Sequence, residues 1–116
     1  MITSKCGAPA PRRLTSSLYD MDIEGRDIGS GVSVIREYTD VVGAGPRLHR
    51  HPYTETFVII AGHARFTLGD ERRDGGPGDT LVAPAGVPHK FEVLGPGAYE
   101  SVHIHENDHF VTEWLE

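Results

Sequence analysis

The sequence predicts an all-β fold built from many short strands, and two observations lead to this prediction. The 116-residue chain contains 14 glycines and 8 prolines, which divide it into short segments about every ten residues, as turns between strands do. No segment repeats its apolar residues with helical spacing over three turns, so little or no helix is expected. Many short strands separated by turns indicate a β-sandwich or a closed barrel.

The elements are expected in a simple order along the chain. Residues 1–14 are predicted to be a loosely ordered N-terminal tail, and residues 15–116 a single domain. Residues 12–21 either add an edge strand or cross the surface. Further strands are predicted over residues 31–42, 54–61, 63–68, 79–83, 90–94 and 99–105, and residues 110–115 close the chain.

Two of these segments carry a more specific prediction. Residues 54–61 are strongly apolar and β-branched, which is typical of a strand that is buried on both faces. Residues 69–78 are charged and rich in glycine, so they are predicted to be the connection of a hairpin.

Composition excludes several classes of function. The formal net charge is −6, which gives no indication of nucleic-acid binding. No apolar run approaches the roughly 20 residues that span a membrane. No charged and then apolar signal segment opens the chain, so a cytoplasmic location is expected. The single cysteine, Cys6, excludes a disulfide within the chain.

Two short blocks of the sequence contain candidate metal ligands. Residues 43–62 include His49, His51 and Glu55, and residues 78–93 include His89. Alternate residues of a strand point to the same face, so His49 and His51 could both reach one ion at about 2.0–2.2 Å. Glu55 has the same parity, whereas His89 has to be brought back by the fold. Taken alone, these residues could equally be a solvated strand edge with a surface carboxylate.

The residues around these candidates resemble the two motifs of the cupin superfamily. The first motif, G-x5-H-x-H-x3-E-x6-G, is matched by Gly43, His49, His51, Glu55 and Gly62. The second, G-x5-P-x-G-x2-H-x3-N, is matched by Gly78, Pro84, Gly86 and His89. Val93 stands where the second motif ends in Asn, and the other nine fixed positions agree.

The resemblance implies a double-stranded β-helix, or jelly-roll barrel, with a metal ion at its open end. The ligands would be His49, His51, Glu55 and His89. Three imidazoles and a carboxylate suit one divalent transition metal (Fe, Mn, Ni, Cu, Co or Zn) and suit Ca or Mg poorly. Val93 shares the parity of His89, so it should face the same interior and make that side of the site more apolar than Asn would.

A second group of histidines lies near the end of the chain. Ser101, His103 and His105 alternate with Val102 and Ile104 on a predicted strand. Either the histidines face water while the apolar pair faces the core, or the polar face lines a cavity. The end of the chain resembles the close of many small single-domain cupins, and this favours a site role for His105. There it would be an outer partner of the metal site or a catalytic proton donor.

The walls of the pocket are predicted from parity with the ligands. Phe57 and Phe91 share the parity of Glu55 and His89. Arg47 shares that of His49, and it either anchors a carboxylate or phosphate at the mouth or is a solvated charge at the rim. The predicted pocket-lining residues are Arg47, Phe57, Phe91, Val93 and His103.

Three hypotheses of function follow from this site. Four protein ligands leave two positions open on an octahedral ion, so the leading hypothesis is a metal-dependent enzyme that acts on a small organic molecule as an oxygenase. The second is a non-redox isomerase, lyase or cyclase that uses a metal-held enolate. The third is a binding module without catalysis. A homodimer is expected, mainly from the resemblance and from an exposed N-terminal strand.

Overall fold

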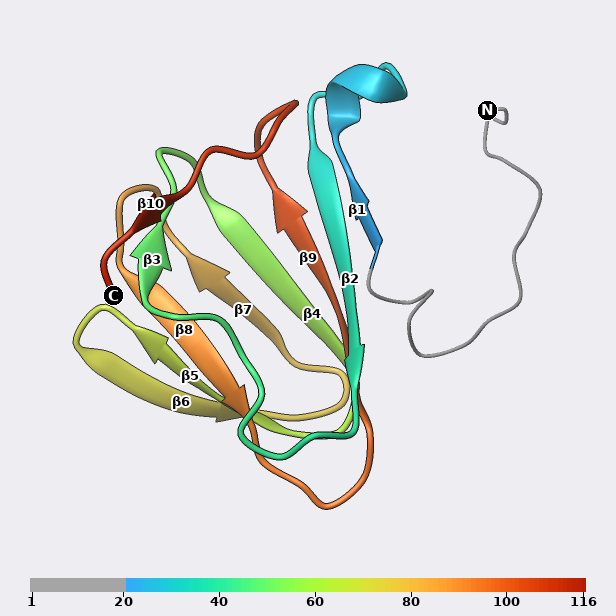
Figure 1. Ribbon diagram of the computed structural model, residues 1–116, viewed down its shortest axis with the longest axis vertical. Coiled ribbons are helices and arrows are strands. Elements are labelled where there is room, and N and C mark those ends of the chain that lie inside the picture. The colour runs from blue at the N-terminus through green and yellow to red at the C-terminus, as the bar shows by residue number, and fades with distance from the viewer. Residues whose placement is uncertain (1–20) are drawn as a thin grey trace.

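Two five-stranded antiparallel sheets face each other in the computed structural model, which describes residues 21–116 (Figure 1). The first sheet has the order β1 (Met21–Ile23), β2 (Ser33–Thr39), β9 (Tyr99–His105), β4 (Glu55–Ala61), β7 (Thr80–Ala83). The second has the order β10 (Glu113–Trp114), β3 (His49–Arg50), β8 (His89–Val93), β5 (Ala64–Leu68), β6 (Glu71–Gly75). The predicted all-β jelly-roll architecture is therefore confirmed.

Helix is almost absent from the part of the chain that the structure describes. The one helical element there is the 3-10 turn η1 (Gly25–Asp27), which is far too short to cross a bilayer. The predicted tail over residues 1–14, including Cys6, lies outside the described residues, as does most of the segment 12–21. Met21 opens β1 at the edge of the first sheet.

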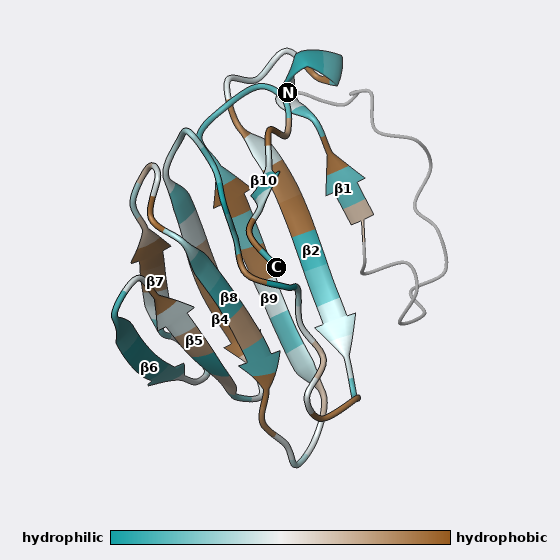
Figure 2. Cartoon of the chain, turned by 60° about the vertical axis from the view of Figure 1, so that its left-hand side comes forward, coloured by the Kyte–Doolittle hydropathy of each residue, from teal (hydrophilic) through white to brown (hydrophobic). Residues whose placement is uncertain are grey.

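The structure corrects two predictions about the strands. Segment 69–78 is not only a connection, because it contains β6, which pairs with β5. Its first four residues are exposed, and Figure 2 shows the strand as hydrophilic, as an edge strand that faces water can be. Segment 54–61 is buried on one face only, because the second sheet covers just the inner side of β4. Ile60, on the outer side, is 50% exposed.

The interior of the sandwich changes from polar to apolar along its strands. On β4 the inward residues are Glu55, Phe57 and Ile59, in that order, and all three are buried. The same gradient runs along β8 from His89 to Val93 and along β9 from His105 to Tyr99. Strand pairing aligns the polar ends, since Glu55 lies opposite His105 on the neighbouring strand. One end of the interior is thus a hydrophobic core, and the other is a buried cluster of titratable groups.

Candidate metal centre

The four predicted metal ligands come together at the polar end of the interior. Each contributes one ligand atom, these atoms all lie within 4.8 Å of one another, and all four residues are buried. Pairing of β3 with β8 places His89 opposite His49, which is how the fold brings the distant histidine back. Glu55 opens β4 in the other sheet, so the site spans both sheets.

Each of the three ligand histidines is held through the ring nitrogen that faces away from the site. In each case Nδ1 bonds to a backbone carbonyl: Arg47 for His49 at 2.7 Å, Val111 for His51 at 2.7 Å and Val87 for His89 at 2.9 Å. A carbonyl can only accept, so Nδ1 must carry the proton. In a neutral ring Nε2 then presents a lone pair, and this is the arrangement that metal-binding histidines have.

These lone pairs converge on a carboxylate oxygen, which creates a need for a cation. Nε2 of His51 and Nε2 of His89 each lie 3.0 Å from Oε1 of Glu55. Nε2 of His51 is buried and has no hydrogen-bond partner. Buried acceptors that face one another are costly unless a positive charge lies between them. One divalent metal ion would satisfy all of them, so the residues present fit the ion that the donor set suggests.

The electrostatics of the cluster favour its metal-binding protonation states. Burial lowers the pKa of His49, which keeps that ring neutral. Burial alone would raise the pKa of the Glu55 carboxyl, but the surrounding imidazoles, that of His105 first, hold it well below its ordinary value. Glu55 is therefore ionised, as a ligand must be.

The two histidines of β9 also face the interior, with 3% of His103 and 2% of His105 exposed. They approach the other carboxylate oxygen of Glu55: Oε2 lies 3.1 Å from Nε2 of His105 and 3.5 Å from Nδ1 of His103. Their far nitrogens are held by hydroxyl groups at 2.7 Å, that of Ser101 for His103 and that of Tyr53 for His105. Burial lowers the pKa of His103 to about 4, so this ring is neutral near pH 7.

The hydrogen bonds of Tyr53 favour one tautomer of His105. The backbone N–H of Val111 donates to the Tyr53 oxygen at 3.2 Å, which leaves the hydroxyl proton for Nδ1 of His105. Burial raises the pKa of Tyr53, so the hydroxyl keeps that proton. In this tautomer Nε2 of His105 carries the ring proton and lies, buried, 3.1 Å from Oε2 of Glu55. It is a proton donor that faces the site.

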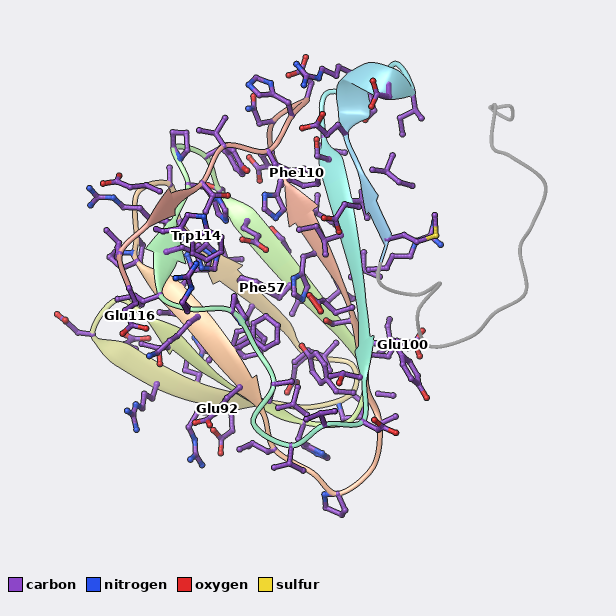
Figure 3. All side chains as sticks on the ribbon, viewed as in Figure 1. Phe57, Glu92, Glu100, Phe110, Trp114 and Glu116 are labelled. Carbon is purple, nitrogen blue, oxygen red and sulfur yellow. The ribbon has the colours of Figure 1, made fainter. Side chains whose placement is uncertain are left out.

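A cavity of about 290 Å³ opens onto the cluster. Its walls beyond the histidines and Glu55 are Asp22, Ile35, Glu37, Pro46, Phe57, Phe91, Phe110, Thr112 and Trp114. Figure 3 shows Phe57 between the two sheets, with Phe110 and Trp114 at the end where the C-terminal segment crosses.

Three of the predicted pocket-lining residues, Phe57, Phe91 and His103, line this cavity, and two do not. The guanidinium of Arg47 lies 5.0 Å from the centre of the Trp114 ring, outside the lining. Val93 is only 1% exposed and packs in the hydrophobic core, two inward positions further along β8 than His89. Replacement of Asn by Val at this position therefore bears on the core rather than on the cavity wall.

Several residues around the site have roles that sequence patterns hardly indicate. As an aromatic residue, Tyr53 is expected to add apolar surface to the pocket if it points inward. Its hydroxyl makes the important contact instead, with Nδ1 of His105 at 2.7 Å. Phe110 and Trp114 are expected to cover the barrel or a partner, and their rings lie 4.9 Å from His105 and 5.1 Å from His49. Val111 acts through backbone atoms, so no side-chain pattern could have revealed it.

Comparisons with known proteins agree with this geometry. Over 84 residues the chain is 36% identical to oxalate decarboxylase OxdC of Bacillus subtilis, a match that covers 63% of this chain and 22% of that protein. Over 42 residues it is 45% identical to dimethylsulfoniopropionate lyase DddQ of Ruegeria pomeroyi, covering 35% of this chain and 21% of that one. The chain thus spans about a fifth of the length of these two relatives.

Solved structures and a protein family give the same assignment. The structure of the Bacillus subtilis decarboxylase at pH 4.6 superposes with a TM-score of 0.72 and 26% identity, over 81% of this chain and 27% of that one. Another structure of that enzyme, with the same TM-score, concerns its Mn(II) centres. Residues 37–96, just over half of the chain, match the Cupin domain family. The chain therefore belongs to the cupin family.

Proposed function

We propose that this cupin is a metal-dependent enzyme that breaks a bond in a small organic acid with transfer of a proton, as lyases and decarboxylases do. One observation carries the proposal: Nε2 of His105, buried and able to carry the ring proton, lines the cavity 3.1 Å from the carboxylate of the metal-binding cluster. A proton donor that lines a cavity beside a metal-binding cluster is placed to donate to a molecule bound there. The decarboxylase and the lyase among the relatives support the same class of reaction.

The metal ion would be held by Nε2 of the three carbonyl-anchored histidines and by Oε1 of Glu55. When bound, it would act as a Lewis acid on an oxygen of the substrate. The donor set suits Fe, Mn, Ni, Cu, Co and Zn, and Mn, the ion of the decarboxylase relative, is the first to test. The N–H of His105 would stabilise negative charge that develops on the substrate or deliver a proton to it.

The cavity also restricts the class of substrate. Among the described residues that line it, no Lys or Arg is present, and four aromatic rings, Phe57, Phe91, Phe110 and Trp114, make up much of the wall. A substrate with one carboxylate on the metal and an apolar body fits this lining. A dicarboxylate would bring a second anionic group that no lining cation meets. The volume of about 290 Å³ lies at the lower end of ligand pockets, so the substrate is small.

An oxygenase is the second candidate, because a ligand set of three histidines and one glutamate leaves two positions of an octahedral ion for substrate and O₂. One experiment separates the candidates. Protein loaded with Mn(II) or Fe(II) is incubated under strict anaerobiosis with a panel of small hydroxy, keto and unsaturated monocarboxylates, and products are detected by mass spectrometry. We expect anaerobic turnover. The same incubation is repeated in air. Turnover only in air would favour the oxygenase, and no turnover with or without O₂ would favour a binding module.

The homodimer and the cytoplasmic location stay predictions, and each has a direct measurement. Light scattering on the purified protein would compare its mass in solution with the 12.7 kDa of one chain. A single-chain mass at micromolar concentration would rule out a stable dimer. Fractionation of the source cells would locate the protein.

A further inference from the structure

We propose that the C-terminal segment of residues 107–116, named the strap below, is a functional part of the metal centre, with Val111 as a positioning residue. Closure of the strap and binding of the metal ion are then coupled. The inference rests on the metal site proposed above and adds an element that contains none of its ligands.

Val111 contacts both halves of the site through its backbone. Its carbonyl accepts a hydrogen bond from Nδ1 of the ligand His51 at 2.7 Å, and its N–H donates to the hydroxyl of Tyr53 at 3.2 Å. The Tyr53 hydroxyl in turn lies 2.7 Å from Nδ1 of His105 and favours the tautomer with the proton on Nε2. One residue of the strap thus orients a metal ligand and the proton donor together.

The anchor of His51 differs from those of the other two ligands in where it comes from. His49 and His89 are held by carbonyls two residues earlier in their own segments, so their anchors stay in place as long as β3 and β8 do. His51 is held by a residue 60 positions later in the sequence. Movement of the strap would remove this anchor and unpair β10 from β3, whereas the carbonyls that hold His49 and His89 lie outside the strap.

The outer end of the strap is attached by a short edge pairing, exposed ion pairs, a hydrogen bond from the Leu115 N–H to the Leu48 carbonyl at 2.9 Å and the packing of the Trp114 ring on His49. β10 pairs only two residues with β3. Near it, an exposed bidentate ion pair joins Arg50 to Glu113, and Glu116 accepts from Lys90 and from the backbone N–H of Leu48. Short edge pairings and exposed ion pairs contribute little stability, and segments held in this way open at low free-energy cost. The proposed coupling takes the closed strap of this structure to be in exchange with an open state.

Linkage makes the coupling reciprocal. A metal ion bound through His51 favours the ring orientation that the closed strap fixes, so the ion should stabilise closure. Opening of the strap frees the His51 ring and should weaken binding. Loss of an outer hydrogen-bond partner of a metal ligand typically lowers affinity about 10- to 100-fold.

Two matched ion pairs allow a controlled test with the full-length protein. Glu113→Lys breaks the strap pair, whose Nε–Oε1 distance is 2.8 Å and whose side chains are 42% and 60% exposed. Asp74→Lys breaks the Arg65–Asp74 pair on the β5–β6 hairpin, also 2.8 Å long and with side chains 41% and 54% exposed. Both variants change the charge equally. Affinity for Co(II) is measured by competition with a chromophoric chelator, together with the visible absorption bands of bound Co(II).

Coupling of this kind predicts a loss of Co(II) affinity of about three- to fivefold, with altered absorption bands, in Glu113→Lys and less than about a twofold change in Asp74→Lys. The free energy of unfolding in urea, measured without metal, should be similar for the two variants. If Glu113 had only a structural role, Glu113→Lys would lower this free energy more than Asp74→Lys does. If Glu113→Lys does not fold, Glu113→Gln with Asp74→Asn replaces the pair. A second measurement is amide exchange in the wild type, where saturating Co(II) should slow exchange in the strap about tenfold or more and leave the β5–β6 hairpin unchanged.

The outcomes distinguish this inference from the proposed function. Wild-type protein that binds Co(II) tightly, with equal affinity in both variants and unchanged exchange in the strap, would overturn the coupling and leave the metal site standing. Wild-type protein that binds no Co(II) would overturn the metal site and the coupling with it.

Discussion

The two sides of the cavity use histidine in different ways, and the difference lies in what holds the far nitrogen of each ring. The histidines next to the second sheet, His49, His51 and His89, are anchored by backbone carbonyls. Those of β9, His103 and His105, are anchored by hydroxyl groups. A carbonyl accepts only, so it fixes one tautomer and leaves a lone pair for a metal ion. A hydroxyl can donate, so it can leave a proton on the nitrogen that faces the site.

Glu55 lies between the two sides and divides them. Its Oε1 faces His51 and His89, whereas its Oε2 faces His103 and His105. One carboxylate can thus be a metal ligand through one oxygen and a neighbour of the proton donor through the other. Under the proposed function, the group that holds the far nitrogen of each histidine separates the metal-binding histidines from the proton donor.

The largest effect should come from removing a carbonyl-anchored histidine. His51→Ala removes a proposed metal ligand. The metal affinity should therefore fall by more than about 100-fold, which is the largest loss typical of removing an outer hydrogen-bond partner. His105→Gln, on the other side, should cost at most about tenfold in affinity. Both values come from metal competition titrations on the folded, metal-free proteins, with circular dichroism to verify the fold.

Equal losses of metal affinity in His51→Ala and His105→Gln would contradict the distinction between the two sides of the cavity, because His105 would then be a ligand as well. X-ray absorption on the Co(II) protein would then show one imidazole more than three.

A smaller but still large effect is expected on turnover from the hydroxyl-anchored side. In His105→Gln the metal is retained and the proton donor is lost, so the turnover number should fall about 100-fold or more. Tyr53→Phe should cause a smaller fall, since it removes only the group that sets the tautomer of His105. Steady-state kinetics on whichever acid the panel identifies would measure both. Unchanged turnover in His105→Gln would remove this residue from the chemistry.

How far the sequence predicts this site depends on whether a residue acts through its side chain at a regular spacing. His49, His51, Glu55 and His89 stand at motif spacings with glycine and proline between them, and the fold brings all four together. Parity along the strands also placed Phe57 and Phe91 in the cavity wall. These predictions needed only the alternation of strand faces.

Other features depend on contacts between distant segments, which no local pattern contains. Tyr53 meets His105 across 52 positions of sequence, and Val111 meets His51 across 60. Arg47 has the parity of a site residue, yet its guanidinium lies against Trp114, because stacking on an aromatic face competes with a place at the mouth. Residues 69–78 looked like a loop because their charges face water, although the backbone forms an edge strand.

The smallest of the expected effects tests the hydroxyl that holds His103. Ser101 is 1% exposed and its hydroxyl lies 2.7 Å from Nε2 of His103. Ser101→Ala leaves that nitrogen buried without a partner, which should lower the free energy of unfolding by about 1–3 kcal/mol, measured by urea denaturation of the metal-free protein. Metal affinity should change less than about twofold, because His103 is not one of the proposed ligands and its Nδ1 lies 3.5 Å from Oε2 of Glu55. A Ser101→Ala protein that is stable but loses its metal would place His103 with the ligands and would reassign β9 to the metal side of the cavity.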